Sequence, residues 1–200
     1  MTTRRLFPTL LHQARLGDDA LLAELEASVR ALAEDDMAGR RWSTAQGYKG
    51  YTSYASLNDL PRRDPAFSDL KRCLDRHVAA FAEACAFDLG GRKLKLDSLW
   101  VNLLRPGGHH SAHIHPHSVV SGTLYLALPE GAGAIRFEDP RLPQMMAAPP
   151  RHADAEEMRT FHTVAPAPGD VLLWESWLRH EVLPHTGRGE RISVSFNYRW

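Results

Sequence analysis

Short extended runs fill the second half of the chain and constrain its fold most strongly. After Gly90-Gly91 no helical periodicity returns, and Pro and Gly separate runs that are rich in β-branched or alternating apolar residues. So many short strands in succession predict a double-stranded β-helix, or jelly roll. The expected strands are Leu94–Leu104, Ser118–Leu128, Ala134–Phe137, Thr160–Val164, Val171–Trp174, His180–Leu183 and Ile192–Tyr198.

Helical spacing is confined to the part of the chain before these runs. Apolar residues recur at helical intervals over residues 19–37, with Gly39 as the stop, and again over Pro65–Phe87. Leu6–Leu16 is a weaker candidate for an edge strand, because Pro8 is tolerated at a sheet edge but not in a central strand. Helices followed by strands indicate an α+β fold.

The order of these elements predicts one domain spanning residues 1–200. Residues 1–90 would be mainly helical, and these N-terminal helices would buttress the jelly-roll core formed by residues 91–200. A chain of 200 residues is long enough to bury roughly 70% of its unfolded surface in one such core.

Two segments lack a clear helix or strand pattern, although the composition of residues 42–60 is typical of irregular or short extended structure. Residues 142–158 are long for a hairpin loop, and long loops in compact domains are often lids or binding loops. Residues 42–60 either line a cleft or cover a hydrophobic edge, and we favour the cover. The aromatic residues of this segment are Trp42, Tyr48, Tyr51 and Tyr54.

The balance of charges argues against polyanionic partners. Lys plus Arg and Asp plus Glu are both 24, so no net field attracts nucleic acid or an anionic membrane. Residues 1–8 lack a signal-peptide pattern, and no apolar stretch is long enough to span a bilayer. Cys73 and Cys85 match no metal or redox spacing, so we expect a reduced, cytoplasmic protein. A monomer and a homodimer both agree with the sequence.

The densest chemical feature is a run of histidines. Five of the eleven histidines lie within residues 109–117, directly before a predicted strand. In an extended segment side chains repeat every two residues, so His113, His115 and His117 would point the same way. Neutral imidazole is a common ligand of Zn, Cu, Fe and Ni, and we predict that His113 and His115 bind a metal. His110 and His117 are expected to be solvated surface residues.

A further histidine, His180, begins a later extended run and would complete the metal site. Two ligands from one segment and one from another leave coordination positions open, as redox or Lewis-acid catalysis requires, whereas a structural site is closed by four protein ligands. Residues 91–200 are therefore expected to be a metal-binding core. If the strand that Arg191 opens returns beside His180, the guanidinium reaches the cavity floor, where it can hold a carboxylate bidentately.

Several motifs of residues 99–199 resemble those of the iron(II)- and 2-oxoglutarate-dependent oxygenases, in particular small bacterial proteins related to prolyl hydroxylases. Residues 1–90 carry little of this resemblance. The motifs are Gly107-Gly108 followed by His113-x-His115, Ser121-Gly122-Thr123-Leu124-Tyr125-Leu126, Phe137-Glu138-Asp139-Pro140-Arg141, Pro168-Gly169-Asp170, His180 and Arg191-x-Ser193.

The resemblance implies an enzyme that uses Fe(2+), O2 and 2-oxoglutarate, and that oxidises a C–H bond while the cosubstrate becomes succinate. His113 would be the first iron ligand, His180 the last, and Arg191 the partner of the distal carboxylate of 2-oxoglutarate. Tyr125 stands where relatives place a tyrosine that also binds this carboxylate, and Ser193 is a weaker candidate for the same contact. No catalytic residue beyond the metal centre is implied.

The chain departs from the family pattern at the middle ligand. The family has His-x-Asp or His-x-Glu, whereas this chain has His115 in that position. Three arrangements follow: three imidazoles hold the iron, or water replaces the middle ligand, or a carboxylate of Asp139 or Glu138 reaches the metal. We favour three imidazoles.

The sequence is also compatible with two rival functions. A cupin-like dioxygenase with a three-histidine metal site would not use 2-oxoglutarate, and it has no need of a buried cation such as Arg191. A non-enzymatic jelly-roll binding module would hold a structural metal or none. The sequence does not identify the substrate, for which a small molecule and a peptide are both compatible.

Overall fold

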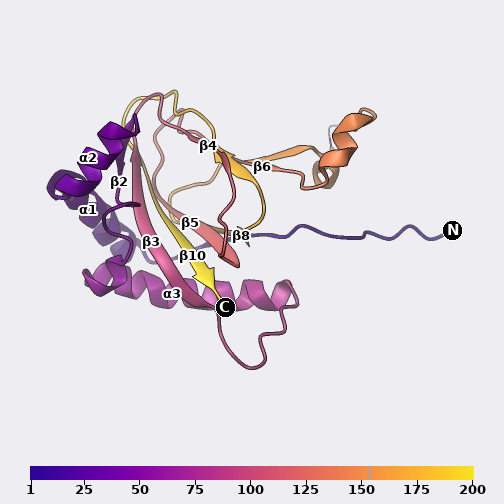
Figure 1. The fold of residues 1–200 in the computed structure, drawn as a ribbon, viewed down its shortest axis with the longest axis horizontal. Helices are drawn as coiled ribbons and strands as arrows, with labels where there is room; N and C mark the ends of the chain where they lie inside the picture. Colours follow the sequence, from indigo (N-terminus) through magenta and orange to yellow (C-terminus); the bar gives the residue numbers. More distant parts are fainter. Residues whose placement is uncertain (153) are drawn as a thin grey trace.

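Two antiparallel sheets and three α-helices make up the structure, a computed structural model that describes residues 1–152 and 154–200 (Figure 1). The sheets face each other and form the predicted double-stranded β-helix. The larger one runs in the order β1 (Leu11–Arg15), β8 (Asp170–Glu175), β5 (Val120–Ala127), β10 (Arg191–Arg199), β3 (Lys95–Leu104) and β2 (Gly50–Thr52). The smaller one runs in the order β4 (His110–His113), β9 (His180–Val182), β6 (Ile135–Glu138) and β7 (Phe161–Val164).

Alternation along β10 assigns the two faces of the larger sheet. Successive side chains of a strand point to opposite faces, and β10 lies centrally, between β5 and β3. Ile192, Val194, Phe196 and Tyr198 belong to the apolar core on one face. The alternate residues Arg191, Ser193, Ser195 and Asn197 line a cavity on the other face. The two faces of this central strand therefore differ: one packs into the apolar core and the other lines the cavity with polar side chains.

Two of the three helices, α1 and α3, cover the apolar face of the larger sheet, and Figure 1 shows the longest, α3, crossing β3 and β10. The third, α2, packs against β2. Each helix begins at an aspartate whose carboxylate accepts a hydrogen bond from a backbone N–H of the first turn, which stabilises a helix start. The helices and their capping residues are α1 (Asp19–Asp35, Asp18), α2 (Met37–Ala45, Asp36) and α3 (Pro65–Ala84, Asp64). The α+β fold with N-terminal helices is confirmed.

The expected helix over residues 19–37 is wrong in one respect, because two helices meet there. Asp36 ends α1 and caps α2 by accepting a hydrogen bond from the Gly39 N–H. Gly39 therefore lies inside a helix and does not stop one. A Cβ at Gly39 would clash with the side chains of Asp36, Ser56 and Tyr51, so close packing accounts for the glycine.

All seven expected strands are present, with ends that differ by no more than two residues. The weak candidate near the N-terminus is confirmed as β1, which pairs only with β8 at the edge of the larger sheet. Pro8 lies outside this strand. The short strand β2 falls within residues 42–60, whose composition allows short extended structure, whereas β4 was not among the expected strands.

The segment between β6 and β7 extends away from the two sheets (Figure 1). It contains two short 3-10 helices, η2 (Leu142–Met146) and η3 (Glu156–Met158). None of its described residues lines the cavity, so the expectation of a lid over the site finds no support in this arrangement. Among the described residues, no helix is long and apolar enough to cross a membrane.

Candidate metal centre

Three histidines from the two predicted segments come together between the sheets. His113 ends β4, His180 opens β9, and the two residues face each other across the antiparallel pair. The candidate ligand atoms of His113, His115 and His180 all lie within 4.8 Å of one another, and the Nε2 atoms of His115 and His180 are 3.3 Å apart. Nitrogens that bind one metal at about 2.1 Å each are roughly 3–4 Å apart, so the cluster suits a single ion.

Two backbone carbonyls fix the ring orientation of His113 and His180. Nδ1 of His113 lies 2.6 Å from the Ser111 carbonyl oxygen, and Nδ1 of His180 lies 2.8 Å from that of Leu178. A carbonyl oxygen only accepts hydrogen bonds, so each Nδ1 carries the proton and each Nε2 keeps its lone pair. Metal-binding histidines are held in this way, with the second nitrogen donating to an acceptor.

Burial keeps two of the three candidate ligand rings neutral. Desolvation, assisted by the nearby His113, lowers the pKa of His180 to about 3 and that of His115 to about 4. Only the neutral imidazole offers a lone pair to a metal. The rings of His115 and His180 therefore keep this lone pair well below neutral pH.

We expect the metal-free protein to lose stability as the pH falls below 6.5. Burial lowers the pKa of His110 and His180 to about 3 and that of His115 to about 4. Between these values and the ordinary 6.5 the unfolded chain binds more protons than the folded chain, so stability is full above pH 6.5 and declines below it. The loss is about 1 kcal/mol per histidine by about pH 5.5.

Urea unfolding of the metal-free protein at about pH 7.5 and about pH 5.5 measures this effect. The midpoint should be lower at the acidic pH, and His110→Gln, which removes one titrating ring, should show a smaller drop. Equal midpoints at the two pH values would show that these rings are not held neutral by the fold.

Other candidate ligands lie elsewhere. The Asp139 carboxylate pairs with Arg141 at 2.8 Å, and the Glu138 carboxylate pairs with Arg179 at 2.9 Å. His117 is exposed and has a positive φ of 69°, because the chain turns after β4. The expectation that His117 points the same way as His113 and His115 is therefore wrong.

The prediction that His110 is a solvated residue is also wrong. His110 begins β4, faces the cavity and lies with Nε2 2.8 Å from the Tyr48 hydroxyl. Its ring is shielded because β4 pairs with β9, where Val182 is its partner. The sequence shows that histidines are concentrated here, but it does not show which of their side chains become buried when the smaller sheet forms.

Arg191 lines the same cavity as the three histidines and is only 1% exposed. Its Nε donates to the Gly133 carbonyl at 3.1 Å, and its Nη1 donates to the Ser193 hydroxyl at 3.2 Å. Nη2 has no hydrogen-bond partner among the described residues, and neither does the buried hydroxyl of Tyr125. The Tyr125 ring centroid is 5.2 Å from the guanidinium carbon.

This corner fits a carboxylate. A buried polar group without a partner costs about 1–3 kcal/mol, and a carboxylate would satisfy both the free Nη2 of Arg191 and the Tyr125 hydroxyl. No aspartate or glutamate is among the described residues that line the cavity, so the charge of Arg191 is not neutralised there. The strand of Arg191 does not return beside that of His180, because β10 lies in the larger sheet and β9 in the smaller one, but Arg191 still lines the cavity of the histidines.

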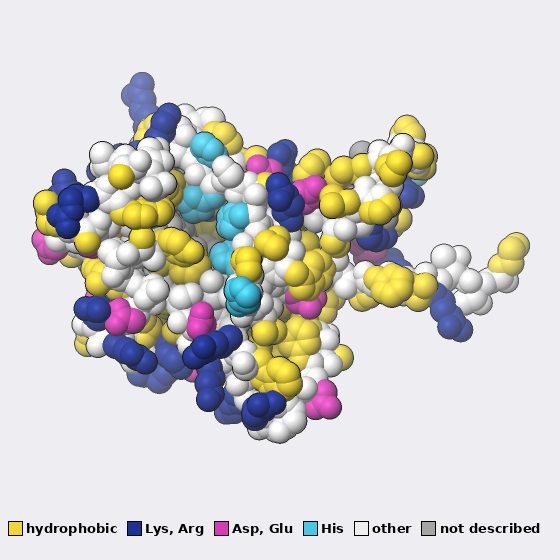
Figure 2. Space-filling view, in the orientation of Figure 1, with side chains coloured by type: hydrophobic (Ala, Val, Ile, Leu, Met, Phe, Trp, Pro, Cys, Tyr) yellow, Lys and Arg dark blue, Asp and Glu magenta, His cyan; other side chains and the backbone are white. Residues whose placement is uncertain are grey.

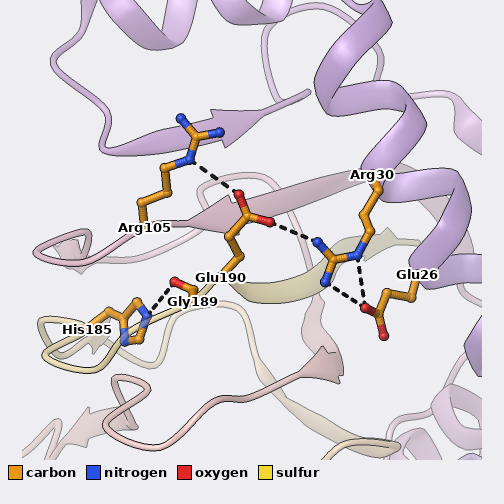
Figure 3. Close-up of polar contacts among 6 residues, drawn as sticks. All are labelled: Glu26, Arg30, Arg105, His185, Gly189 and Glu190. Carbon is orange, nitrogen blue, oxygen red and sulfur yellow. Dashed lines mark hydrogen bonds and ion pairs between the residues drawn. The ribbon is translucent and has the colours of Figure 1, made fainter.

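The loop before β10 is anchored on both sides (Figure 3). The Glu190 carboxylate pairs with Arg30 of α1 at 2.8 Å and with Arg105 after β3 at 3.3 Å. One residue earlier, the Gly189 carbonyl oxygen lies 3.1 Å from Nε2 of the buried His185. These contacts fix the backbone from which the Arg191 side chain enters the cavity.

The cavity has a volume of about 310 Å³ and contains the histidine cluster and Arg191. Figure 2 shows histidines along one side of a hollow, with hydrophobic side chains opposite. The favoured role of residues 42–60 as a cover is wrong for three aromatic residues that line this cavity. They are Trp42, Tyr48 and Tyr54, whereas Tyr51 lies in the core.

Further lining residues were not singled out from the sequence. Trp100 and Asn102 come from β3, and Trp174 comes from β8. The buried Nε1 of Trp174 is a further donor without a partner among the described residues. The alternation of β3 would have placed Trp100 and Asn102 on one face, but it did not show that this face meets a cavity.

Known proteins share this fold. A Pseudomonas putida prolyl-4-hydroxylase is 20% identical, with a TM-score of 0.65 over 96% of this chain and 94% of its own. HygX from Streptomyces hygroscopicus, solved with nickel and 2-oxoglutarate bound, is 15% identical, with a TM-score of 0.59 over 96% and 82%. The non-heme alpha-ketoglutarate-dependent epimerase SnoN from nogalamycin biosynthesis is 16% identical, with a TM-score of 0.66 over 96% and 77%. No curated protein matches the chain.

One family model matches residues 98–197, half of the chain, and its description is "Putative 2OG-Fe(II) oxygenase". The matched residues run from β3 to β10 and include both the histidine cluster and the Arg191 corner. The donor set suits iron, and the unpaired groups suit a carboxylate of 2-oxoglutarate. The chain belongs to the family of 2OG-Fe(II) oxygenases, which are enzymes that use these two groups.

Proposed function

We propose that the protein hydroxylates a C–H bond of its substrate and converts 2-oxoglutarate and O2 to succinate and CO2, with one oxygen atom entering each organic product. The observation that carries this proposal is the unneutralised, buried Arg191, whose Nη2 and neighbouring Tyr125 hydroxyl lack partners in the cavity that holds the three histidines. Bound iron and 2-oxoglutarate would supply the oxidising chemistry. The chain supplies ligands, orientation and shielding from water.

Each of these contributions has its own residues. His113, His115 and His180 would hold the metal through neutral ring nitrogens. Arg191 and Tyr125 would orient the distal carboxylate, and Ser193 would hold Nη1 of Arg191 in place. The two sheets enclose the cavity so that Arg191 is buried, and its interaction with an anion is correspondingly strong.

An anaerobic titration with Fe(II) and then 2-oxoglutarate tests this function. The chelate of iron by the keto acid gives a weak visible charge-transfer band, which we expect to appear at one equivalent of each. The cupin-like alternative would account for three imidazoles, but it leaves the buried Arg191 without a partner. Metal binding without a band or any affinity for 2-oxoglutarate would favour that alternative.

His115 should act as the middle ligand. We expect His115→Ala to weaken Fe(II) binding by about tenfold or more, whereas His115→Asp should retain the metal because it restores the carboxylate pattern of the family. Anaerobic equilibrium dialysis measures both affinities. Unchanged affinity in His115→Ala would mean that water, Asp139 or Glu138 takes this position instead.

We also propose a cytoplasmic location. Cys73 and Cys85 are both free in the part of the chain described, and free, partly buried thiols are typical of a reducing compartment. The equal numbers of basic and acidic residues support a small-molecule or peptide substrate more than a polyanionic partner.

A further inference from the structure

A continuous aromatic wall leads from the outside of the protein to the metal centre. Trp42 and Tyr54 have ring centroids 6.3 Å apart, and Tyr54 meets Trp100 edge to face at 5.3 Å. Trp100 in turn lies 6.0 Å from the ring of His115. Tyr54 is 56% exposed and Trp100 only 6%, so the wall begins at the rim and ends beside a candidate metal ligand.

The cavity beside this wall offers no ion-pair partner to a charged substrate group. No described lining residue is an aspartate or glutamate, so a cation would find only the aromatic faces, whose cation–π contacts contribute about 0.5–2 kcal/mol. Among the described lining residues Arg191 is the one Lys or Arg, and the proposed function assigns this buried side chain to the cosubstrate. Burying a charge without an ion-pair partner costs several kcal/mol, which exceeds the cation–π contribution and disfavours charged groups of either sign.

The polar side chains around the wall largely satisfy each other. Asn102 Oδ1 accepts hydrogen bonds from Thr52 at 2.9 Å and from Tyr48 at 3.3 Å. Asn102 Nδ2 donates to Ser195 at 3.0 Å. Asn197 Oδ1 likewise accepts from Ser121 at 2.8 Å. Apart from the unpaired Nε1 of Trp174, few polar atoms are left to bind substrate hydroxyls, so the aromatic faces are the main recognition surface.

We propose that the substrate presents one compact, uncharged ring to the metal centre, packed against the wall formed by Trp42, Tyr54 and Trp100. This inference rests on the proposed function, because the reacting group must come close to the metal. A cavity of about 310 Å³ that also accommodates 2-oxoglutarate favours a compact group beside the metal. Aromatic faces favour rings through stacked and edge-to-face contacts.

Three probes of matched shape test the charge preference: benzyl alcohol, benzylammonium and benzoate. Their affinities are measured by saturation-transfer NMR on protein loaded with Zn(II) and 2-oxoglutarate. Benzyl alcohol should bind, and the affinity of benzylammonium should be at least about tenfold lower, because its charge finds no ion-pair partner. Benzoate should bind only when 2-oxoglutarate is left out, since it would then pair with Arg191.

Two variants locate the ring. Tyr54→Ala should weaken benzyl alcohol about threefold to tenfold, in line with the contribution of one aromatic contact. Trp177→Ala is the matched control, because Trp177 is 46% exposed but does not line the cavity, and it should change nothing. With Mn(II) in place of Zn(II), the proton relaxation of benzyl alcohol should be enhanced, as expected for a ring close to the metal.

Clear results would overturn the inference. These are benzylammonium binding as tightly as benzyl alcohol, benzoate binding equally well with 2-oxoglutarate present, and equal probe affinities in Tyr54→Ala and wild type. Failure of 2-oxoglutarate itself to bind would count against the proposed function alone. The comparison of benzyl alcohol with benzylammonium can then be repeated on the Zn(II)-loaded protein without cosubstrate.

Discussion

Replacement of His180 by alanine should abolish stoichiometric Fe(II) binding while the fold persists. His180 is 4% exposed, its Nδ1 is held by the Leu178 carbonyl, and its Nε2 lies 3.3 Å from that of His115. Without this ring the cluster keeps two imidazoles, and a divalent metal at such a site binds far more weakly. His113→Ala should have the same effect, because His113 stands opposite His180 in the strand pair.

Anaerobic equilibrium dialysis followed by metal analysis measures this loss, and circular dichroism checks the fold. His109→Ala is a suitable control, since His109 belongs to the same run of histidines but is exposed and outside the cluster. The control should bind one equivalent of iron. Full-affinity binding in both His113→Ala and His180→Ala would place the metal elsewhere.

Arg191→Ala should weaken 2-oxoglutarate binding by roughly 30-fold to several thousand-fold. Truncation of one partner in a buried, charge-assisted pair costs about 2–5 kcal/mol, largely because the other charge is left unpaired, and about 1.4 kcal/mol corresponds to tenfold. Arg191→Lys should recover only part of this loss, because an ammonium cannot reproduce the bidentate fork. Fe(II) affinity should barely change, since Arg191 is not a candidate ligand.

Calorimetry with 2-oxoglutarate on Mn(II)-loaded protein gives these affinities without oxidation. Arg188→Ala provides the matched control, because Arg188 lies three residues earlier in the same loop and is exposed. It should bind 2-oxoglutarate like the wild type. Equal affinities for wild type and Arg191→Ala would remove the main support for 2-oxoglutarate as cosubstrate in this corner.

The strands and the pairing of His113 with His115 were predictable because they depend on local pattern. In β10 the alternation of Ile192, Val194 and Phe196 with polar residues is visible in the sequence, and it matches the two faces of the sheet. The spacing of His113 and His115 brought them into one cluster, although the chain turns directly afterwards.

The rest depends on how distant segments pack. His110 lies beside Tyr48 because β4 folds back over β9, a relation between segments that no periodicity encodes. The position of Arg191 also depends on packing, because Arg191 reaches the site from the larger sheet and not from a strand next to that of His180. Gly39 looked like a helix stop because the sequence did not show the crowding around it.

The position of the aromatic wall has a consequence for how such an enzyme diverges. The family model begins at residue 98, so the candidate metal ligands, Arg191 and Trp100 lie within the matched half, whereas Trp42 and Tyr54 of the wall lie outside it. If the proposed roles hold, the reaction depends on residues of the matched half, and the choice of substrate depends partly on residues of the other half. We expect a relative with different residues at positions 42 and 54 to keep the reaction and to accept a different substrate.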